Sequence, residues 1–267
     1  MILAVLLAPL TARGADALFA GALPPGQLAG PPMSVVSAQF GGTWSSGNAS
    51  GYLVTSGVSA ERRWARNRVS GTLTLNLGRA RVDSNGNGHL DDAEREATPV
   101  ETARRSNVEL RYDRYVGTRD SVYAMVGTLA DPFAGFDQRM QVQAGLSRTL
   151  LRTRASTAVV EVGAHASHED RVPGIEPATL DVYSVRATAK GTHRFNEAVS
   201  AQGQIEVLES VLEPDDVRVA TNAALVATLT GSLDVRLSTQ ISYDNVPVEG
   251  FVPLDQVTLA TLVASFR

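Results

Sequence analysis

Residues 233–243, LDVRLSTQISY, decide the fold class of this chain. Their side chains alternate without interruption between apolar or β-branched residues and polar ones. The first face carries Leu233, Val235, Leu237, Thr239, Ile241 and Tyr243, and the second carries Asp234, Arg236, Ser238, Gln240 and Ser242. A period of two is typical of a β-strand whose two faces meet different surroundings. The segment therefore predicts a strand with one apolar and one hydrated face.

The same period continues along the chain from Ser34 to the C-terminus. In residues 139–147, for example, Met140, Val142 and Leu146 oppose Arg139 and Gln141. Counting extended segments between turn signals predicts about twelve strands, the even number expected of a bacterial barrel. Their expected spans are 34–47, 51–63, 66–82, 101–115, 119–130, 137–151, 154–168, 178–193, 198–212, 216–230, 233–244 and 255–266.

Strand length and charge distinguish a membrane barrel from a soluble sandwich, which also alternates. Many of the expected strands exceed the roughly 5–6 residues usual in globular sheets and reach the roughly 9–11 that a membrane strand requires. Their polar faces carry charges along the whole length, as a hydrated lumen would. The last strand ends near an aromatic residue, Phe266, although Arg267 follows it. We therefore expect an all-β fold, a transmembrane antiparallel β-barrel of about twelve strands.

The connections between the expected strands fall into two alternating sets. One set is short and tends to be basic, as in RWARN and VGTRD. The other is mostly longer and often acidic, as in HEDRVPGIEP and DNVPVEGFVPLD. Membrane barrels have short periplasmic turns and longer external loops. With both termini in the periplasm, the acidic loops are expected to face outward.

Composition excludes several classes of protein. Hydrophobic residues make up 43% and charged residues 19%, which argues against overall disorder. The net charge of −4 and the lack of a basic stripe argue against nucleic-acid binding. The chain has no cysteine, so thiol catalysis, thiolate metal sites and disulfides are excluded.

The N-terminus resembles an export signal. The apolar run Ile2–Leu10 has the length of a signal-peptide core, and Ala15-Asp16-Ala17 is a small-x-small cleavage site, although a basic n-region is missing. The alternative is a short buried apolar helix. We expect a signal peptide at 1–17, a Pro/Gly-rich lead-in at 18–33 and a barrel domain at 34–267. No later apolar run approaches the ~18 residues of a membrane helix.

Residues 83–94, DSNGNGHLDDAE, have the spacing of a calcium-binding loop of the EF-hand type. The expected metal ligands are Asp83, Asn85, Asn87, the backbone carbonyl of His89, Asp91 through water, and Glu94. Gly88 occupies the turn position. The alternative is a solvated external turn, because Asp, Asn and Gly also favour ordinary turns. A strand precedes the loop, and Asp91–Ala97 can start a short helix. We therefore expect a strand–loop–helix Ca²⁺ site inserted into the barrel.

Three segments carry a resemblance to a known family: FGGTWSSGN at 40–48, the stretch at 109–151, and the ending ISYDNVPVEGFVPLDQVTLATLVASFR. They are similar to the salt-induced outer membrane proteins, a domain of unknown function. The resemblance covers roughly Val35 to Arg267, apart from the calcium-like insertion. It implies an outer-membrane β-barrel and no established catalytic residue. An exported outer-membrane protein of a Gram-negative bacterium is expected, with outer-membrane lipids and the barrel-assembly machinery as partners.

The sequence leaves several functions open. The lumen charges suit a passive channel with weak ion selection or a structural network that closes the barrel. A soluble secreted β-rich calcium-binding protein is an alternative from another class. A calcium-dependent outer-membrane phospholipase is less favoured: His165 and Ser167 form a His-x-Ser pair, but they share a strand face with Glu161, which we assign to the lumen. We therefore expect no enzymatic activity.

Overall fold

The computed structural model describes residues 33–45, 50–84, 90–230, 233–247 and 253–266. It contains twelve strands and the short helix α1, Asp92–Glu96, which follows β3. The strands are β1 Met33–Ser45, β2 Gly51–Trp64, β3 Asn67–Ala80, β4 Val100–Tyr115, β5 Asp120–Asp131, β6 Phe136–Arg152, β7 Ser156–Arg171, β8 Thr179–Arg194, β9 Val199–Ser210, β10 Val217–Thr230, β11 Leu233–Asp244 and β12 Leu254–Phe266. A single 3-10 turn, Pro132–Ala134, links β5 and β6.

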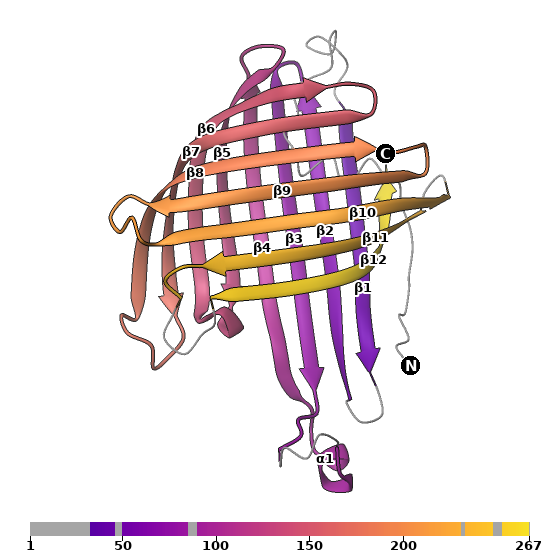
Figure 1. Ribbon diagram of the computed structural model, residues 1–267, viewed down its shortest axis with the longest axis vertical. Coiled ribbons are helices and arrows are strands. Elements are labelled where there is room, and N and C mark those ends of the chain that lie inside the picture. Colours follow the sequence, from indigo (N-terminus) through magenta and orange to yellow (C-terminus); the bar gives the residue numbers. More distant parts are fainter. Residues whose placement is uncertain (1–32, 46–49, 85–89, 231–232, 248–252, 267) are drawn as a thin grey trace.

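The strands form one closed antiparallel barrel in which each strand pairs with its neighbours in sequence and β12 pairs with β1. In Figure 1, strands β8 to β12 run in front of, and across, strands β1 to β4 of the opposite wall. This crossing is expected when the strands of a closed barrel tilt relative to its axis. Closure pairs every strand with two neighbours, which is the condition for placing strands in a membrane.

The outer face of the barrel is apolar. In β6, for example, Met140, Val142 and Leu146 are between 54% and 59% exposed, because their side chains project away from the sheet with nothing packed on them. Corresponding residues project from β4 and β8, including Leu110, Tyr183 and Val185. Exposed apolar side chains on nearly every strand would be unfavourable in water but favourable in lipid.

The inner face is polar and largely buried. The residues that alternate with the exposed ones on β8 are Val182, Ser184, Arg186, Thr188 and Lys190, all of them buried. Because cross-strand register partners lie on the same face, these rows continue from strand to strand around the lumen. The core of this protein is therefore an interior of polar and charged side chains.

The two ends of the barrel differ as the sequence predicts. One end, the short-turn end, has the connections 65–66, 116–119, 153–155, 195–198 and 231–232. The other, the long-loop end, has 46–50, 81–99, 132–135, 172–178, 211–216 and 245–253. Helix α1 extends beyond the rim at the long-loop end (Figure 1).

The predicted fold class and strand number are confirmed, and the strand ends differ from expectation by at most three residues. The largest difference is at β7, which continues to Arg171 because residues of the acidic segment pair with β6 and β8. Strand β1 begins at Met33, the last residue of the expected lead-in. The expected signal peptide and residues 18–32 lie outside the described residues. No helix in the described part of the chain has the length and apolar character needed to cross a bilayer.

Candidate functional site

Glu161 on β7 is the centre of a charge network in the lumen. Its carboxylate accepts hydrogen bonds from both terminal nitrogens of Arg111 on β4, at 2.8 and 3.1 Å. A terminal nitrogen of Arg186 and the ammonium of Lys190, both on β8, lie 3.1 Å from the same carboxylate. The side chain of Glu161 is 0% exposed. Three cations therefore surround one buried anion.

The network extends along the wall in both directions. Arg111 also contacts Asp113 at 2.8 Å, and Asp113 contacts Arg68 of β3 at 3.0 Å. Arg68 continues to Glu61 of β2 at 2.9 Å. In the other direction, Arg186 donates to Glu206 of β9 at 2.6 Å. We call this set the short-turn cluster; its members are Glu61, Arg68, Arg111, Asp113, Glu161, Arg186, Lys190 and Glu206.

Tyr123 of β5 packs between the short-turn cluster and the barrel wall. The Arg111 guanidinium carbon lies 4.2 Å from the centre of the Tyr123 ring, and Arg186 donates a hydrogen bond of 2.9 Å to its hydroxyl. The ring needs room over β6 and β7, and Gly145 and Gly163 provide it. A Cβ atom on either glycine would lie 2.9 Å from the Tyr123 hydroxyl and would overlap backbone atoms of the other strand. The two glycines thus let Arg111 cross the wall to Glu161.

Mutual neutralisation stabilises these buried charges. An unpaired charge in a low-dielectric interior costs several kcal/mol, and removing one partner of a buried pair costs about 3–5 kcal/mol. Each carboxylate of the short-turn cluster has at least one arginine or lysine within 3.1 Å. The short-turn cluster can block one side of the lumen, and its charges can attract or repel ions that pass beside it.

A second network, the long-loop cluster, lies at the opposite end. It consists of Arg139, Glu169, Asp216, Arg218 and Asp244. Glu169 of β7 contacts Arg139 of β6 at 2.8 Å and Arg218 of β10 at 2.6 Å. Arg218 also contacts Asp216 at 3.2 Å and Asp244 of β11 at 3.4 Å. The Arg139 guanidinium stacks on Phe136 at 4.0 Å. The charges of this end are therefore also paired.

Between the two clusters, the lumen wall formed by β9 to β11 is polar and uncharged over two register rows. Strands β9 to β11 present neutral lumen-facing residues in two register rows: Gln204 with Asn222 and Gln240, and Ala224 with Ser238. Gln204, Ser238 and Gln240 are partly exposed, and Asn222 is exposed. The lumen is thus asymmetric. Buried ion pairs lie near its two ends, and between them β9 to β11 present more accessible amides and hydroxyls.

Six basic residues face the lumen, as strand alternation predicts: Arg111, Arg139, Arg186, Lys190, Arg218 and Arg236. Five of the six belong to the two clusters, and Arg236 does not. His165 and Ser167 are also lumen-facing, buried and on the same strand face as Glu161, as expected. A phospholipase would need them at the lipid face, so their position does not support that reading.

The calcium-like loop is described in part. Asn85, Asn87 and His89 lie outside the described residues. Glu94 is buried and accepts hydrogen bonds from the backbone nitrogen and hydroxyl of Ser84, each 2.7 Å. Asp91 caps α1 by accepting from the Glu94 backbone at 2.9 Å, while Glu94 accepts from the Asp91 backbone at 3.1 Å.

The capping box places Asp91 and Glu94 at the start of the exiting helix, where a calcium hand requires its last two ligands. The expected helix is confirmed as α1. Leu90 is 2% exposed and anchors the loop. Among the described residues, no three acidic or histidine side chains gather closely enough to hold a metal. The donor types nevertheless fit a hard cation, since Asp83, Asp91 and Glu94 supply carboxylate oxygens.

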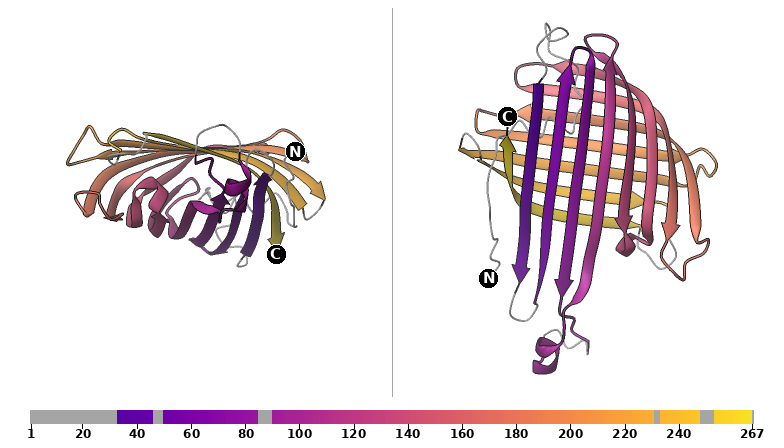
Figure 2. Two further views of the ribbon diagram at one scale, coloured as in Figure 1. Left: turned by 90° about the horizontal axis from the view of Figure 1, so that it is seen from below. Right: turned by 180° about the vertical axis from the view of Figure 1, so that it is seen from behind.

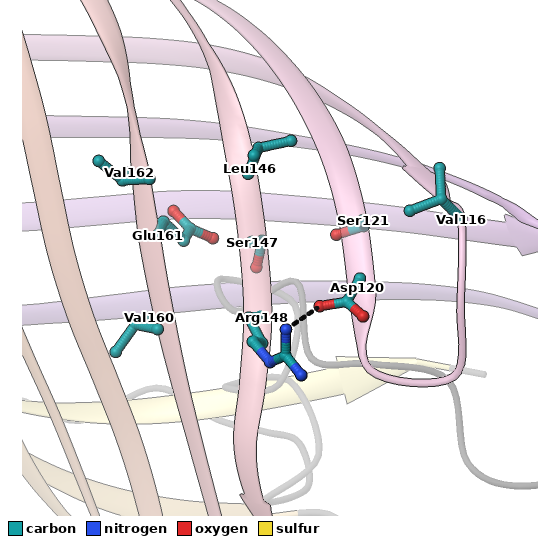
Figure 3. Close-up of a pocket in the computed structure, with 9 residues that line it drawn as sticks. All are labelled: Val116, Asp120, Ser121, Leu146, Ser147, Arg148, Val160, Glu161 and Val162. Atoms are coloured by element: carbon teal, nitrogen blue, oxygen red, sulfur yellow. Dashed lines mark ion pairs between the residues drawn. The ribbon is translucent and has the colours of Figure 1, made fainter.

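A pocket of about 590 Å³ lies at the short-turn end of β5 to β7 (Figure 3). Leu146, Val160 and Val162 belong to the outward rows and give it an apolar lining, while Glu161, Ser121 and Ser147 belong to the inward row. Asp120 and Arg148 form an ion pair of 3.6 Å at its rim. Because its apolar side faces outward, the pocket suits contact with lipid chains more than chemistry on a solute.

The closed barrel, its apolar outer face and its polar lumen define a membrane-spanning β-barrel of the outer-membrane type. The chain belongs to the family described as a protein of unknown function, DUF481, whose model matches residues 38–266. This match confirms the predicted domain of unknown function.

One solved structure supports the same fold. The chain is similar to the NanC porin, with 11% identity and a TM-score of 0.51, over 88% of this chain and 99% of that one. It is also similar to an outer membrane channel from Pseudomonas putida F1, with 14% identity and a TM-score of 0.42, over 92% of this chain and 97% of that one. The KdgM porin has 8% identity and a TM-score of 0.46, over 88% of this chain and 100% of that one. At 11% identity the likeness to the NanC porin shows the fold alone. A search of curated proteins finds no match.

Tyr123, Gly145 and Gly163 are functional positions that sequence reasoning missed. A glycine in a strand signals a bulge or a close approach, so Gly145 and Gly163 could have been noticed. Tyr123 could not have been recognised as their partner from the sequence. Its side chain reaches over two neighbouring strands, and strand order alone does not say which side chain fills the space above the glycines.

Proposed function

We propose that the protein is an outer-membrane barrel that conducts small polar solutes passively along the less charged wall of its lumen. The observation that carries the proposal is the asymmetry of the lumen. Ion pairs fix the long side chains near the two ends of the lumen, while Asn222 and Gln240 between them stay accessible. Neutral amides offer hydrogen bonds to a hydrated solute without holding it tightly. An outer-membrane location of a Gram-negative envelope, with lipids and the barrel-assembly machinery as partners, is part of the proposal.

Single-channel recording in planar bilayers tests this function. The purified barrel is expected to give discrete conductance steps that scale with salt concentration. Replacing Arg111 and Glu161 together by alanine removes two long side chains from the lumen and is expected to enlarge the step. The matched control is the pair Asp120→Ala and Arg148→Ala, which removes an exposed ion pair outside the lumen. A folded barrel with no steps under any condition would contradict the proposal.

An envelope structural role is the second candidate. It is favoured by the complete burial of Arg68, Asp113 and Glu161, whose side chains are each 0% exposed. In that role the short-turn cluster acts as a plug that stiffens the barrel. The recording separates the two roles, because a plugged barrel conducts only after the cluster is truncated. The salt-induced character implied by the family resemblance fits either role.

The external loop at 83–94 is proposed to bind Ca²⁺ through Asp83, Asn85, Asn87, His89, Asp91 and Glu94. Support comes from the ligand spacing and from the capping box that places Asp91 and Glu94 at the start of α1. A bound calcium would order the long β3–β4 connection or link it to anionic headgroups at the membrane surface. Facing an external medium, the site suits an affinity of about 10⁻⁴–10⁻³ M, the range of extracellular calcium modules.

A further inference from the structure

Strands β1 and β12 pair over a short stretch only. Their register runs from Val36 with Phe266 to Gly41 with Thr261. In contrast, β1 pairs with β2 over its whole length, and β12 pairs with β11 from Leu254 to Ala264. Within the described residues, β12 between Leu254 and Ala260 therefore has no strand partner on the β1 side. We call this opening the β1/β12 seam; Figure 2 (right) shows β12 bending up to meet β1.

A row of lumen-facing residues crosses the seam at its last paired position. Gly41 of β1 is the register partner of Thr55 on β2 and of Thr261 on β12. Thr261 is in turn the partner of Arg236 on β11. Gly41 contributes no side chain, and the methyl group of Thr261 occupies the space that a Cβ would need. Two hydroxyls and one guanidinium are thus brought to one level of the lumen.

The three polar groups of this row form no ion pair, and its two hydroxyls are unpaired among the described atoms, as are those of Ser37 and Ser167. In the described part of the chain, Arg236 makes no ion pair, unlike the arginines of the short-turn and long-loop clusters. The hydroxyls of Thr55 and Thr261 are buried without a hydrogen-bond partner among the described atoms. Asp234, the next lumen-facing residue of β11, is buried and makes no ion pair with Arg236. The row therefore has donors and a positive charge but no anion.

An apolar track leads from this row toward the long-loop end. Along β12 the next lumen-facing residues are Leu259 and Val257, opposite Ser238 and Gln240 of β11. Val257 is 45% exposed although it faces the lumen, because no strand covers that stretch of β12. The guanidinium of Arg236 and the two threonine hydroxyls are thus followed by apolar side chains along the edge of β12 that opens to the membrane.

We propose that the β1/β12 seam binds an anionic amphiphile, a long-chain carboxylate. Arg236, Thr261 and Thr55 hold its carboxylate in the lumen, while Leu259 and Val257 guide its alkyl chain through the seam to the outer leaflet. The proposal rests on the channel proposed above and names a class of solute for it. Charge complementarity selects the head, since a guanidinium is the side chain best suited to a carboxylate. The apolar track selects the tail, since each methylene removed from water favours binding.

Binding of radiolabelled dodecanoate to the full-length barrel in phosphatidylcholine nanodiscs tests this, with empty discs as the blank. The wild type is expected to bind dodecanoate saturably and to bind hexanoate and dodecanol much more weakly. Arg236→Gln is expected to lower the affinity for dodecanoate about tenfold or more, the factor of a charge-assisted hydrogen bond. Arg236→Lys should retain part of the affinity for dodecanoate. Leu259→Asn should weaken dodecanoate binding and leave the weak hexanoate binding unchanged.

Arg114→Gln is the matched control, because Arg114 is an exposed arginine on the outer face of β4. Each variant is first checked for the heat-dependent gel shift of a folded barrel. Equal dodecanoate affinity in wild type and Arg236→Gln would overturn the proposal, as would equal affinity for hexanoate. Competition by phosphatidylglycerol in the disc would assign the site to a membrane lipid and also overturn it. Conductance is recorded without any amphiphile, so failure of the channel and failure of the seam site give different results.

Discussion

Arg111 on β4 and Glu161 on β7 meet across two intervening strands, through hydrogen bonds of 2.8 and 3.1 Å. Side chains three strands apart do not usually touch along a curved wall. They do so here because Tyr123 supports the arginine. Gly145 and Gly163 have no side chains that would fill the space above the inner face of the sheet. This contact joins the ion pairs of the short-turn cluster into one network.

Glu161→Gln is expected to lower the free energy of unfolding by about 3–5 kcal/mol, because Arg111, Arg186 and Lys190 would share a buried site without their anion. Urea unfolding of the barrel in lipid vesicles, followed by the heat-dependent gel shift, measures the change. The control Asp120→Asn breaks the exposed pair with Arg148, and should cost less than about 1 kcal/mol. Equal losses for the two variants would show that Glu161 is not the centre of a buried network.

Gly145→Ala and Gly163→Ala are each expected to destabilise the barrel by about 1–3 kcal/mol, the usual cost of overpacking. The added methyl group would overlap backbone on the paired strand and displace the Tyr123 hydroxyl. Gly191→Ala and Gly203→Ala are matched controls on β8 and β9, where the nearest atoms would lie 3.7 and 4.0 Å from the new Cβ. The same urea titration ranks the four variants. A Gly163→Ala barrel as stable as Gly203→Ala would refute the packing described for Tyr123.

The β1/β12 seam predicts uneven hydrogen exchange along β12. Backbone amides between Leu254 and Ala260 that point away from β11 have no strand partner and should exchange faster than those between Thr261 and Phe266. Exchange followed by mass spectrometry on the folded barrel measures this. Strand β7, which is paired along both edges, gives the reference for slow exchange. Uniform protection along β12 would mean that the seam is closed in the membrane.

Asp83→Asn is expected to weaken Ca²⁺ binding to the β3–β4 loop, because it removes the first carboxylate of the proposed ring. Calorimetric titration of the purified barrel with Ca²⁺ measures the affinity directly. Asp92→Asn is the control, since Asp92 lies in the first turn of α1 outside the ligand positions. If wild type binds no Ca²⁺ at millimolar concentration, or if Asp92→Asn weakens binding as much as Asp83→Asn, the proposed ligand set is wrong.

The sequence predicted the strands and the face of each side chain because one physical rule governs both. Each strand separates lipid from the lumen, so alternation is strict wherever both media are present, as in Leu233–Tyr243. The short helix after Asp91 was predictable for a different local reason, the capping box of Asp91 and Glu94.

The ion pairs could not be predicted from alternation, because they depend on register and on curvature. Arg111 and Glu161 are 50 positions apart in the chain, and only the closed barrel with its glycines brings them together. The seam is equally hidden. Strand β12 has the normal length, and its missing partner becomes visible only when its register with β1 ends at Gly41 and Thr261.

Cell fractionation followed by gel electrophoresis of unheated and boiled membrane extract tests the central claim, a closed barrel in the outer membrane, most directly. A closed barrel is expected to give a band in the outer-membrane fraction that migrates differently before and after boiling, because it resists the detergent until it is heated. A protein found only in the soluble periplasmic or secreted fraction, with no shift on boiling, would contradict the account.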